Sequence, residues 1–509
     1  MQPTQIITVS LYAMAALTLL GGFFIGRRKR FLRSLIRCAA TVSAAVFAFV
    51  TVLSFYEVLS APLPLGQLQS YIELYPEARE GLEMLVMLTE VFPKSFSLLM
   101  LLPTSLLGPL LFCLLFWVYR LTVGLVAIIV CLVLRIVLRK RKLAPFSKLL
   151  GGMFGVVRGA VFLFVFIFPL MGYLSMAGQV FSAVDPAELP AEYTEIKAEV
   201  DPFLDAFQNH PVSKTVYGAG GEAVFEALTS FSHQNTEGES FKVVWSEEID
   251  QYITILFHAK PLSDFDLENV DQDQIDAIKA LAGDIGSSDV LSTIIAEVLS
   301  AACTAWDNGE AFLDTPCPTV EEENAAAILN AAIDTFKDST PDTVAEDLLS
   351  VAELFEVMAE HDVFNALSDP DQLLDLLGDD AFMSSAIEVL KDNERLEGLL
   401  KETVKTGVKA AIESAADDEA FSEAVDSLTA SAADELNALA SLETKEEQVA
   451  AVSDAITQAL TNSNIDQGGA VVDYVAELLI DEFADKIQNG TVTAEDIAAY
   501  LGLTKAEQQ

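Results

Sequence analysis

One stretch, residues 139–178, restricts what this chain can fold into more than any other. It contains, in order, a basic cluster, a glycine-lined helix face and an apolar run: Arg139–Lys142; Gly151, Gly155 and Gly159; and Ala160–Ala177. Positive charge collects on the cytoplasmic side of membrane segments, and glycines four residues apart share one face of a helix. The stretch therefore predicts a transmembrane helix entered from the cytosol. Everything after Gly178 is then expected on the outer side of the membrane.

Three earlier apolar runs are also long enough to cross a bilayer. Together with the last run they give four predicted spans, at about residues 6–25, 38–59, 110–134 and 160–177. The loop between the first two contains six Lys and Arg residues and no acid, which places it in the cytosol. A signal peptide carries its charge before the apolar region, whereas Arg27–Arg30 follows it here, so we expect an uncleaved anchor with its N-terminus outside.

The third apolar region is too long for one span. We interpret residues 98–107 as a short interfacial or re-entrant piece and residues 110–134 as the span, which places Arg120 near the middle of the membrane. A charge at that depth costs at least about 2.5 kcal/mol, so Arg120 should face the bundle interior or a watery cavity. A structural role, capping carbonyls or snorkelling, and a functional role both stay open. A tight hairpin around Arg120 is disfavoured, because it would place Arg139–Lys142 outside.

The glycine face and Arg158 each have two interpretations. Gly151, Gly155 and Gly159 allow another helix backbone to approach closely, either within the chain or in an oligomer. Arg158 lies at the inner boundary, where it either contacts anionic lipid headgroups or a cytoplasmic partner, or serves as a snorkelling anchor.

Charge divides the chain at the end of the last apolar run. Residues 1–184 contain 16 Lys and Arg and 6 Glu, whereas residues 185–509 contain 14 Lys and Arg and 69 Asp and Glu. Such a break indicates a change of compartment or domain. Nucleic acid is excluded as a partner of the acidic part, because phosphate would repel it.

The acidic part is expected to be folded and mostly helical. Apolar residues recur at helical spacing after Thr340-Pro341, after Thr444 and from Phe421 to Ala432, whereas residues 241–257 are ambiguous between helix and strand. Pro316-Cys317-Pro318 separates an aromatic-richer section, 185–315, from a section rich in Ala, Asp and Glu, 319–509. The predicted fold is all-α: a four-helix membrane domain, 1–178, followed by an acidic helical extracytoplasmic domain.

Motifs for chemistry are scarce. The four histidines lack metal-ligand spacing, and no phosphate-binding loop, zinc-protease helix or nucleophile elbow occurs, so we predict no catalytic residue, cofactor or metal. The acidic cluster from Asp264 to Asp273 fails the calcium-loop template, since Asn269 stands where Gly is required and Ile275 where Glu is required.

The cysteines allow one disulfide in an exported domain. Cys303 and Cys317 are the two cysteines of the acidic part. A bridge between them would close a short loop and contribute about 3 kcal/mol. Two free thiols are the alternative, and the choice stays open. Cys38, Cys113 and Cys131 lie in apolar runs, where a thiol packs as a small hydrophobe.

Two motifs of the first 178 residues are those of a known family. They are Gly26–Phe31 with the following Arg33, and Leu150–Gly159 before the last span. In these motifs and in its four spans the chain resembles the colicin V production protein family. The resemblance implies an inner or plasma membrane protein tied to toxin production and envelope function, without an assigned catalytic residue. The chain departs from the family in having Ser147-Lys148 where Asp-Arg is usual, and in its large acidic part.

These observations predict a non-enzymatic, multi-pass protein of the plasma membrane, with its N-terminus and its acidic domain outside. It would act as a membrane scaffold or envelope factor linked to toxin production or secretion. The acidic domain would bind an envelope protein, a cation or cell-wall material. The alternative is a transporter or channel component that uses Arg120 and the glycine-lined helix face.

Overall fold

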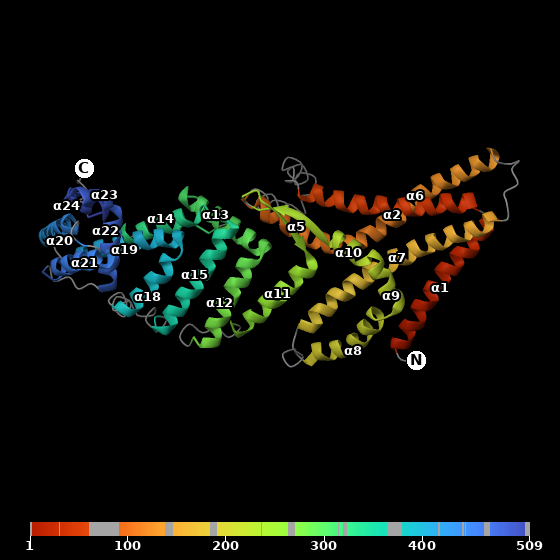
Figure 1. Cartoon of the computed structure of the whole chain (residues 1–509), viewed down its shortest axis with the longest axis horizontal. Coiled ribbons are helices and arrows are strands. Elements are labelled where there is room, and N and C mark those ends of the chain that lie inside the picture. The colour runs from red at the N-terminus through yellow and green to blue at the C-terminus, as the bar shows by residue number, and fades with distance from the viewer. Residues whose placement is uncertain are drawn as a thin grey trace. The chain divides into compact units, whose positions relative to one another are not determined.

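The computed structural model forms two compact units, Met1–Leu256 and Phe257–Gln509 (Figure 1). It describes residues 3–29, 31–60, 91–137, 146–183, 191–235, 237–262, 270–313, 315–318, 323–361, 363, 379–415, 418–439, 442, 444–462 and 469–503. The predicted basic cluster Arg139–Lys142 and the acidic residues from Asp264 to Glu268 lie outside these ranges. The described residues are overwhelmingly helical, with one two-stranded sheet, which confirms the all-α class.

Among the described residues, five helices are long and apolar enough to cross a membrane. Four belong to the first unit and contain the four predicted spans: α1 (Pro3–Lys29), α2 (Phe31–Ser60), α6 (Gly108–Val137) and α7 (Phe146–Ala183). Large apolar side chains point outward from them, such as Leu17 and Leu121, each about three-quarters exposed at 75% and 74%. Exposed apolar surface of this extent is typical of a lipid-facing bundle. These features suggest a multi-pass membrane protein.

The fifth apolar helix, α13 (Asp289–Asp307), belongs to the second unit. It packs against α12 (Gln272–Ser287), α14 (Glu323–Phe336) and α15 (Pro341–Glu360). Its buried face includes Ser292, Thr293 and Glu297. A helix that buries polar groups against neighbouring helices is typical of a protein core, although the length of α13 and its mean hydropathy of 1.3, the lowest of the five, also fit a span.

Two pairings organise the bundle. α1 runs antiparallel to α7 along most of its length, and α2 packs against both α6 and α7 (Figure 1). α5 (Pro93–Leu106), which covers most of the predicted re-entrant piece, is a separate helix against α2. We call the end where α1 stops and α2 and α7 begin the basic end of the bundle.

The first unit continues well beyond the boundary at 178 that composition suggested. α8 (Ala191–Gln208), α9 (Pro211–Val216), a π-helical turn (Tyr217–Gly221) and α10 (Glu222–Thr229) pack against the opposite end of the bundle. Phe207 of α8 joins a core with Leu11 and Ile167, and the Gln208 side-chain amide donates to the Leu174 carbonyl at 2.8 Å. The ring of Phe207 is therefore buried against α1 and α7, and the segment that contains it belongs to the membrane unit.

The ambiguous segment 241–257 contains both structures. β1 (Ser230–Gln234) and β2 (Ser240–Val244) form an antiparallel hairpin in which Phe231 pairs with Val243. α11 (Trp245–Ala259) begins directly after β2, and the Trp245 indole donates to Ser105 Oγ at 2.8 Å.

The second unit is built from helices packed around an apolar core. After α15 come α18 (Asp380–Lys391), α19 (Glu394–Ala415), α20 (Asp418–Ala438), α21 (Lys445–Asn462), α22 (Gly469–Glu482), α23 (Ala484–Asn489) and α24 (Ala494–Tyr500). The predicted helix starts are confirmed: Thr340 caps α15, and the Glu447 backbone N–H donates to Thr444 Oγ1 at 3.2 Å. The expected break at 316–318 separates α13 from α14, which pack against each other, so it is not a boundary between compact units.

Candidate functional site

Glycines bring the backbones of α1 and α7 into direct contact. Gly22 lies against Gly155, Gly26 against Gly151, and Gly159 against Thr18. A methyl group added at Gly22, Gly26, Gly155 or Gly159 would overlap a carbonyl oxygen of the facing helix. This close approach is the geometry that small residues permit between membrane helices.

The predicted glycine face is therefore occupied by a helix of the same chain. Gly152 next to it lies against the ring of Phe23, where an added methyl carbon would be 2.6 Å from a ring carbon. The partner residues Gly22 and Gly26 were missed in the sequence, although two glycines four residues apart in an apolar run were the available signal.

A buried hydroxyl ties a third helix to this interface. Ser34 of α2 donates from Oγ to the carbonyl oxygen of Gly151 at 2.7 Å. The carbonyl is the one that Gly26 lies against, so α1, α2 and α7 meet at one point near the basic end.

The side chain of Arg120 turns toward the basic end of the bundle. Its Nη1 lies beside Gly124, one turn further along α6. A methyl carbon added at Gly124 would be 2.5 Å from this nitrogen. Its guanidinium carbon is 5.9 Å from the centre of the Phe162 ring, and that of Arg158 is 5.6 Å from the same ring. This orientation corresponds to snorkelling, one of the two roles considered from the sequence.

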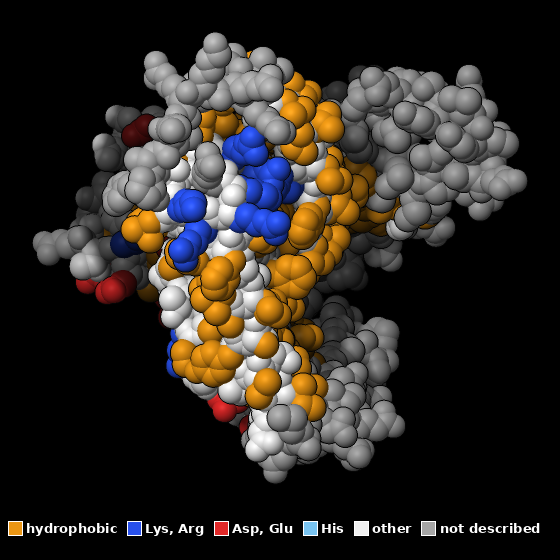
Figure 2. Space-filling view, turned by 90° about the vertical axis from the view of Figure 1, so that its right-hand side faces the viewer, with side chains coloured by type: hydrophobic (Ala, Val, Ile, Leu, Met, Phe, Trp, Pro, Cys, Tyr) orange, Lys and Arg blue, Asp and Glu red, His pale blue; other side chains and the backbone are white. Residues whose placement is uncertain are grey.

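Three cations from three helices line a narrow cleft at this end. Lys29 of α1, Arg37 of α2 and Arg158 of α7 surround it, together with Ile25, Ser34, Gly22, Gly26 and Gly155. Figure 2 shows Lys and Arg side chains gathered on this end of the unit, bordered by hydrophobic side chains. Of the three, only Arg158 was named from the sequence as a candidate contact residue, because Lys29 and Arg37 come next to it only in the folded structure.

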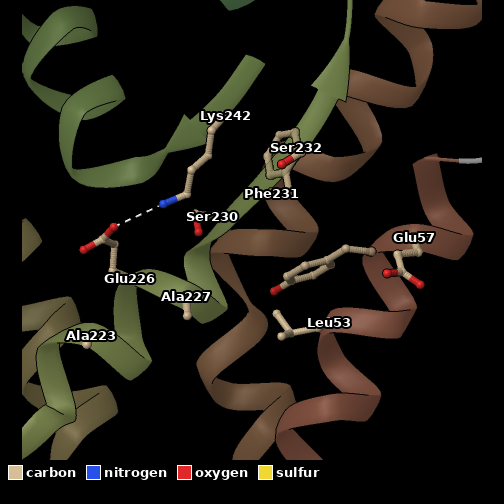
Figure 3. Close-up of a pocket in the computed structure, with 10 residues that line it drawn as sticks. Leu53, Glu57, Ala223, Glu226, Ala227, Ser230, Phe231, Ser232 and Lys242 are labelled. Atoms are coloured by element: carbon tan, nitrogen blue, oxygen red, sulfur yellow. Dashed lines mark hydrogen bonds and ion pairs between the residues drawn. The ribbon is translucent and has the colours of Figure 1, made fainter. Parts of the chain in front are cut away.

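A larger pocket lies at the other end of α2, between α2, α10 and the hairpin (Figure 3). Its volume is about 480 Å³. Leu53, Tyr56 and Glu57 form one wall, and the Lys242–Glu226 ion pair, with 3.2 Å between Nζ and Oε1, forms the opposite wall. The Tyr56 hydroxyl donates to the Leu228 carbonyl at 2.5 Å, so it is engaged in structure. The pocket offers a mixed polar and apolar surface, and its lining contains no paired nucleophile and base.

The cysteines of the second unit are free thiols in this structure. Cys303 is buried within α13, and Cys317 Sγ lies 3.6 Å from the Trp306 carbonyl. In the bundle, Cys38 and Cys131 are buried, and Cys113 Sγ contacts the Val165 carbonyl at 3.3 Å.

The histidines have local structural partners. His210 caps α9 by accepting from the Val212 backbone N–H at 3.2 Å, and burial lowers the pKa of its imidazole. His258 Nδ1 lies 2.6 Å from Asp284 Oδ2, and His361 Nδ1 lies 3.8 Å from Asp379 Oδ2.

Asp271, from the acidic cluster considered for calcium, caps α12 in a capping box with Gln274. Within the part of the chain that the structure describes, no three His, Cys, Asp or Glu residues are grouped to hold a metal ion.

Comparison with known proteins assigns no family. No protein-family model, curated protein or solved structure matches this chain. The resemblance to colicin V production proteins therefore rests on the sequence motifs alone.

Proposed function

We propose that this protein is a non-enzymatic scaffold of the plasma membrane that holds its acidic helical unit on the outer side. The four apolar helices of the first unit would span the bilayer, with the N-terminus outside. Support for this orientation comes from the basic residues where α1 ends and α2 begins, and from those of the segment before α7. The second unit, after an even number of crossings, then lies outside.

The observation that carries the proposal is the contact between α1 and α7. The first and last spans meet backbone to backbone at Gly22 and Gly155, so no path for a solute runs between these two helices. Ser34 joins α2 to the same point. A bundle whose helices are joined in this way is suited to a rigid anchor.

The second unit would provide the binding surface. It is strongly acidic in sequence, and its helices enclose a continuous apolar core from Ile387 to Leu503. We infer an envelope protein or cell-wall material as its partner. The link to toxin production or secretion follows from the sequence resemblance of the first 178 residues.

A truncation tests the scaffold. A strain producing residues 1–256 should insert the membrane unit normally but lose the envelope or toxin-related phenotype of the full chain. Membrane insertion is measured by carbonate extraction, and the phenotype by complementation of a deletion strain. Full complementation by residues 1–256 would contradict the proposal.

One observation favours transport as a second candidate. Arg120 Nε is buried and has no hydrogen-bond partner among the described residues. If Arg120 serves a solute path, Arg120→Leu should abolish a measurable flux in vesicles, whereas Arg33→Leu, at an exposed position of α2, should not. On the scaffold proposal neither variant changes flux.

A further inference from the structure

We propose that Lys29, Arg37 and Arg158 bind the phosphate group of an anionic phospholipid. These three side chains line one cleft at the basic end of the bundle and come from α1, α2 and α7. Basic pockets between membrane helices on the cytoplasmic side are suited to lipid headgroups. The shared chemistry is a phosphate ester, which a lipid or a soluble phosphate compound can supply.

Charge balance favours an anion at this cleft. Residues 1–56 and 91–184 contain no Asp or Glu. The one acid of the four long helices is Glu57, which lies in the last turn of α2, about 30 Å from Arg37 along the helix. Lys29, Arg37, Arg120 and Arg158 are close enough to repel one another. Clustered cations without a counter-ion are costly in a low-dielectric setting, and a bound phosphate relieves that repulsion.

The size of the cleft fits one oxygen of a phosphate. Its free volume is about 20 Å³, and a water-sized group needs about 10 to 15 Å³. The remaining phosphate oxygens would lie at the mouth, within reach of two guanidinium groups and one ammonium. Arginine suits this task because its planar fork binds two oxygens at once.

The surroundings favour a lipid over a soluble compound. Ile25 of the cleft lining is 46% exposed, and Phe24 and Val157, which neighbour cleft residues in the sequence, are 63% and 48% exposed. Figure 2 shows hydrophobic side chains directly bordering the basic ones. A ligand with a phosphate head and acyl tails satisfies both surfaces together.

The experiment measures ligand binding to the purified full-length protein in neutral detergent by native mass spectrometry. The probes are phosphatidylglycerol, phosphatidylcholine and glycerol 3-phosphate. We expect phosphatidylglycerol to bind at least about tenfold more tightly than phosphatidylcholine, and raised salt to weaken it. Glycerol 3-phosphate distinguishes the sources of the phosphate: weak binding supports the lipid, whereas binding equal to that of phosphatidylglycerol contradicts the lipid.

Matched variants locate the site. Arg158→Gln and Arg37→Gln should each weaken phosphatidylglycerol binding about tenfold or more, because each removes a charge-assisted hydrogen bond. Arg158→Lys should fall between Arg158→Gln and the natural protein. Arg33→Gln removes the same charge from an exposed position of α2 near the same end, outside the cleft lining, and should change binding by less than about twofold.

Unfolding of the variants is monitored separately, by helical circular dichroism and by the thermal midpoint without added lipid. A variant that stays helical and loses selectivity for phosphatidylglycerol supports the site. Equal losses in Arg33→Gln and Arg158→Gln, or equal binding of phosphatidylglycerol and phosphatidylcholine, would overturn it.

Discussion

Gly22 and Gly155 lie so close that a methyl group on either residue would overlap the carbonyl oxygen of the other. The pair joins the first apolar helix of the membrane unit to the last apolar helix of that unit. Gly26–Gly151 and Thr18–Gly159 extend the contact by one turn in each direction, in antiparallel register. We call this contact the glycine seam.

Substitutions in the glycine seam should separate α1 from α7. Gly22→Ala and Gly155→Ala each place a methyl group on a backbone carbonyl oxygen, at 2.2 Å and 2.0 Å, which a rigid helix cannot move aside. We expect each variant to lose about 2 kcal/mol or more of unfolding free energy, as overpacked sites do. The thermal midpoint of the full-length protein in detergent measures the loss.

Gly21 supplies the control for that experiment. It neighbours Gly22 on α1, yet no atom lies within 4 Å of the position that its side chain would take. Gly21→Ala should therefore leave the midpoint unchanged or raise it slightly, since alanine favours the helix. Equal losses in Gly21→Ala and Gly22→Ala would show that the seam does not hold the two helices together.

The sequence predicted one side of this seam. Gly151, Gly155 and Gly159 marked a helix face for close packing, because spacing alone determines which residues share a face. Spacing does not determine which helix comes to that face, so α1 and an oligomer partner were equivalent until the tertiary structure was known. For the same reason, the sequence did not show that Arg158 lies next to Lys29 and Arg37.

Acid should destabilise the first unit through His233. Burial, aided by the nearby positive charge of Lys94, lowers the pKa of this imidazole to about 4 from an ordinary value near 6.5. Between these values the unfolded chain binds a proton that the folded protein excludes, so the free energy of unfolding falls as the pH falls through this window. The complete effect is about 3 kcal/mol.

Denaturant unfolding of the full chain at pH 7 and pH 5 measures this contribution. His233→Gln keeps a neutral polar side chain and should lose less stability between the two pH values than the natural protein does. An identical pH dependence in both proteins would exclude His233 as the source.

The ion pair of Asp347 and Arg395 should be important for the second unit. Arg395 Nη1 lies 2.9 Å from Asp347 Oδ2, and the Arg395 guanidinium also donates to the Thr335 carbonyl and Ser339 Oγ. Asp347 is buried, so Arg395→Met leaves an uncompensated charge, at an expected cost of about 3 to 5 kcal/mol of unfolding free energy.

Lys486→Met is the control. It breaks the more exposed ion pair with Asp496 and should cost about 1 kcal/mol or less. Denaturant unfolding compares the two, and similar costs would contradict this role for Arg395.

Thiol titration should find both cysteines of the second unit free. Cys317 is partly exposed and should react in the folded protein, whereas Cys303 is buried in α13 and should react only after unfolding. Prior reduction should not change the number of reactive thiols. An increase in the number of reactive thiols after reduction would contradict this prediction and support the Cys303–Cys317 disulfide.

The long helices were predictable because their apolar runs have the length of a bilayer, and the caps at Thr340 and Thr444 marked helix starts correctly. The extent of the first unit was not. Phe207 and Phe225 lie in a section whose composition differs from that of the apolar helices, which suggested a separate domain. Only their packing against the bundle shows that they belong to the first unit.

Sidedness is the central claim, and protease protection tests it most directly. Protease added to sealed cells that produce the full chain should digest the second unit, while the membrane unit and the loop around Arg27–Arg33 stay protected until the cells are lysed. A second unit that survives in sealed cells and is digested only after lysis would contradict the account.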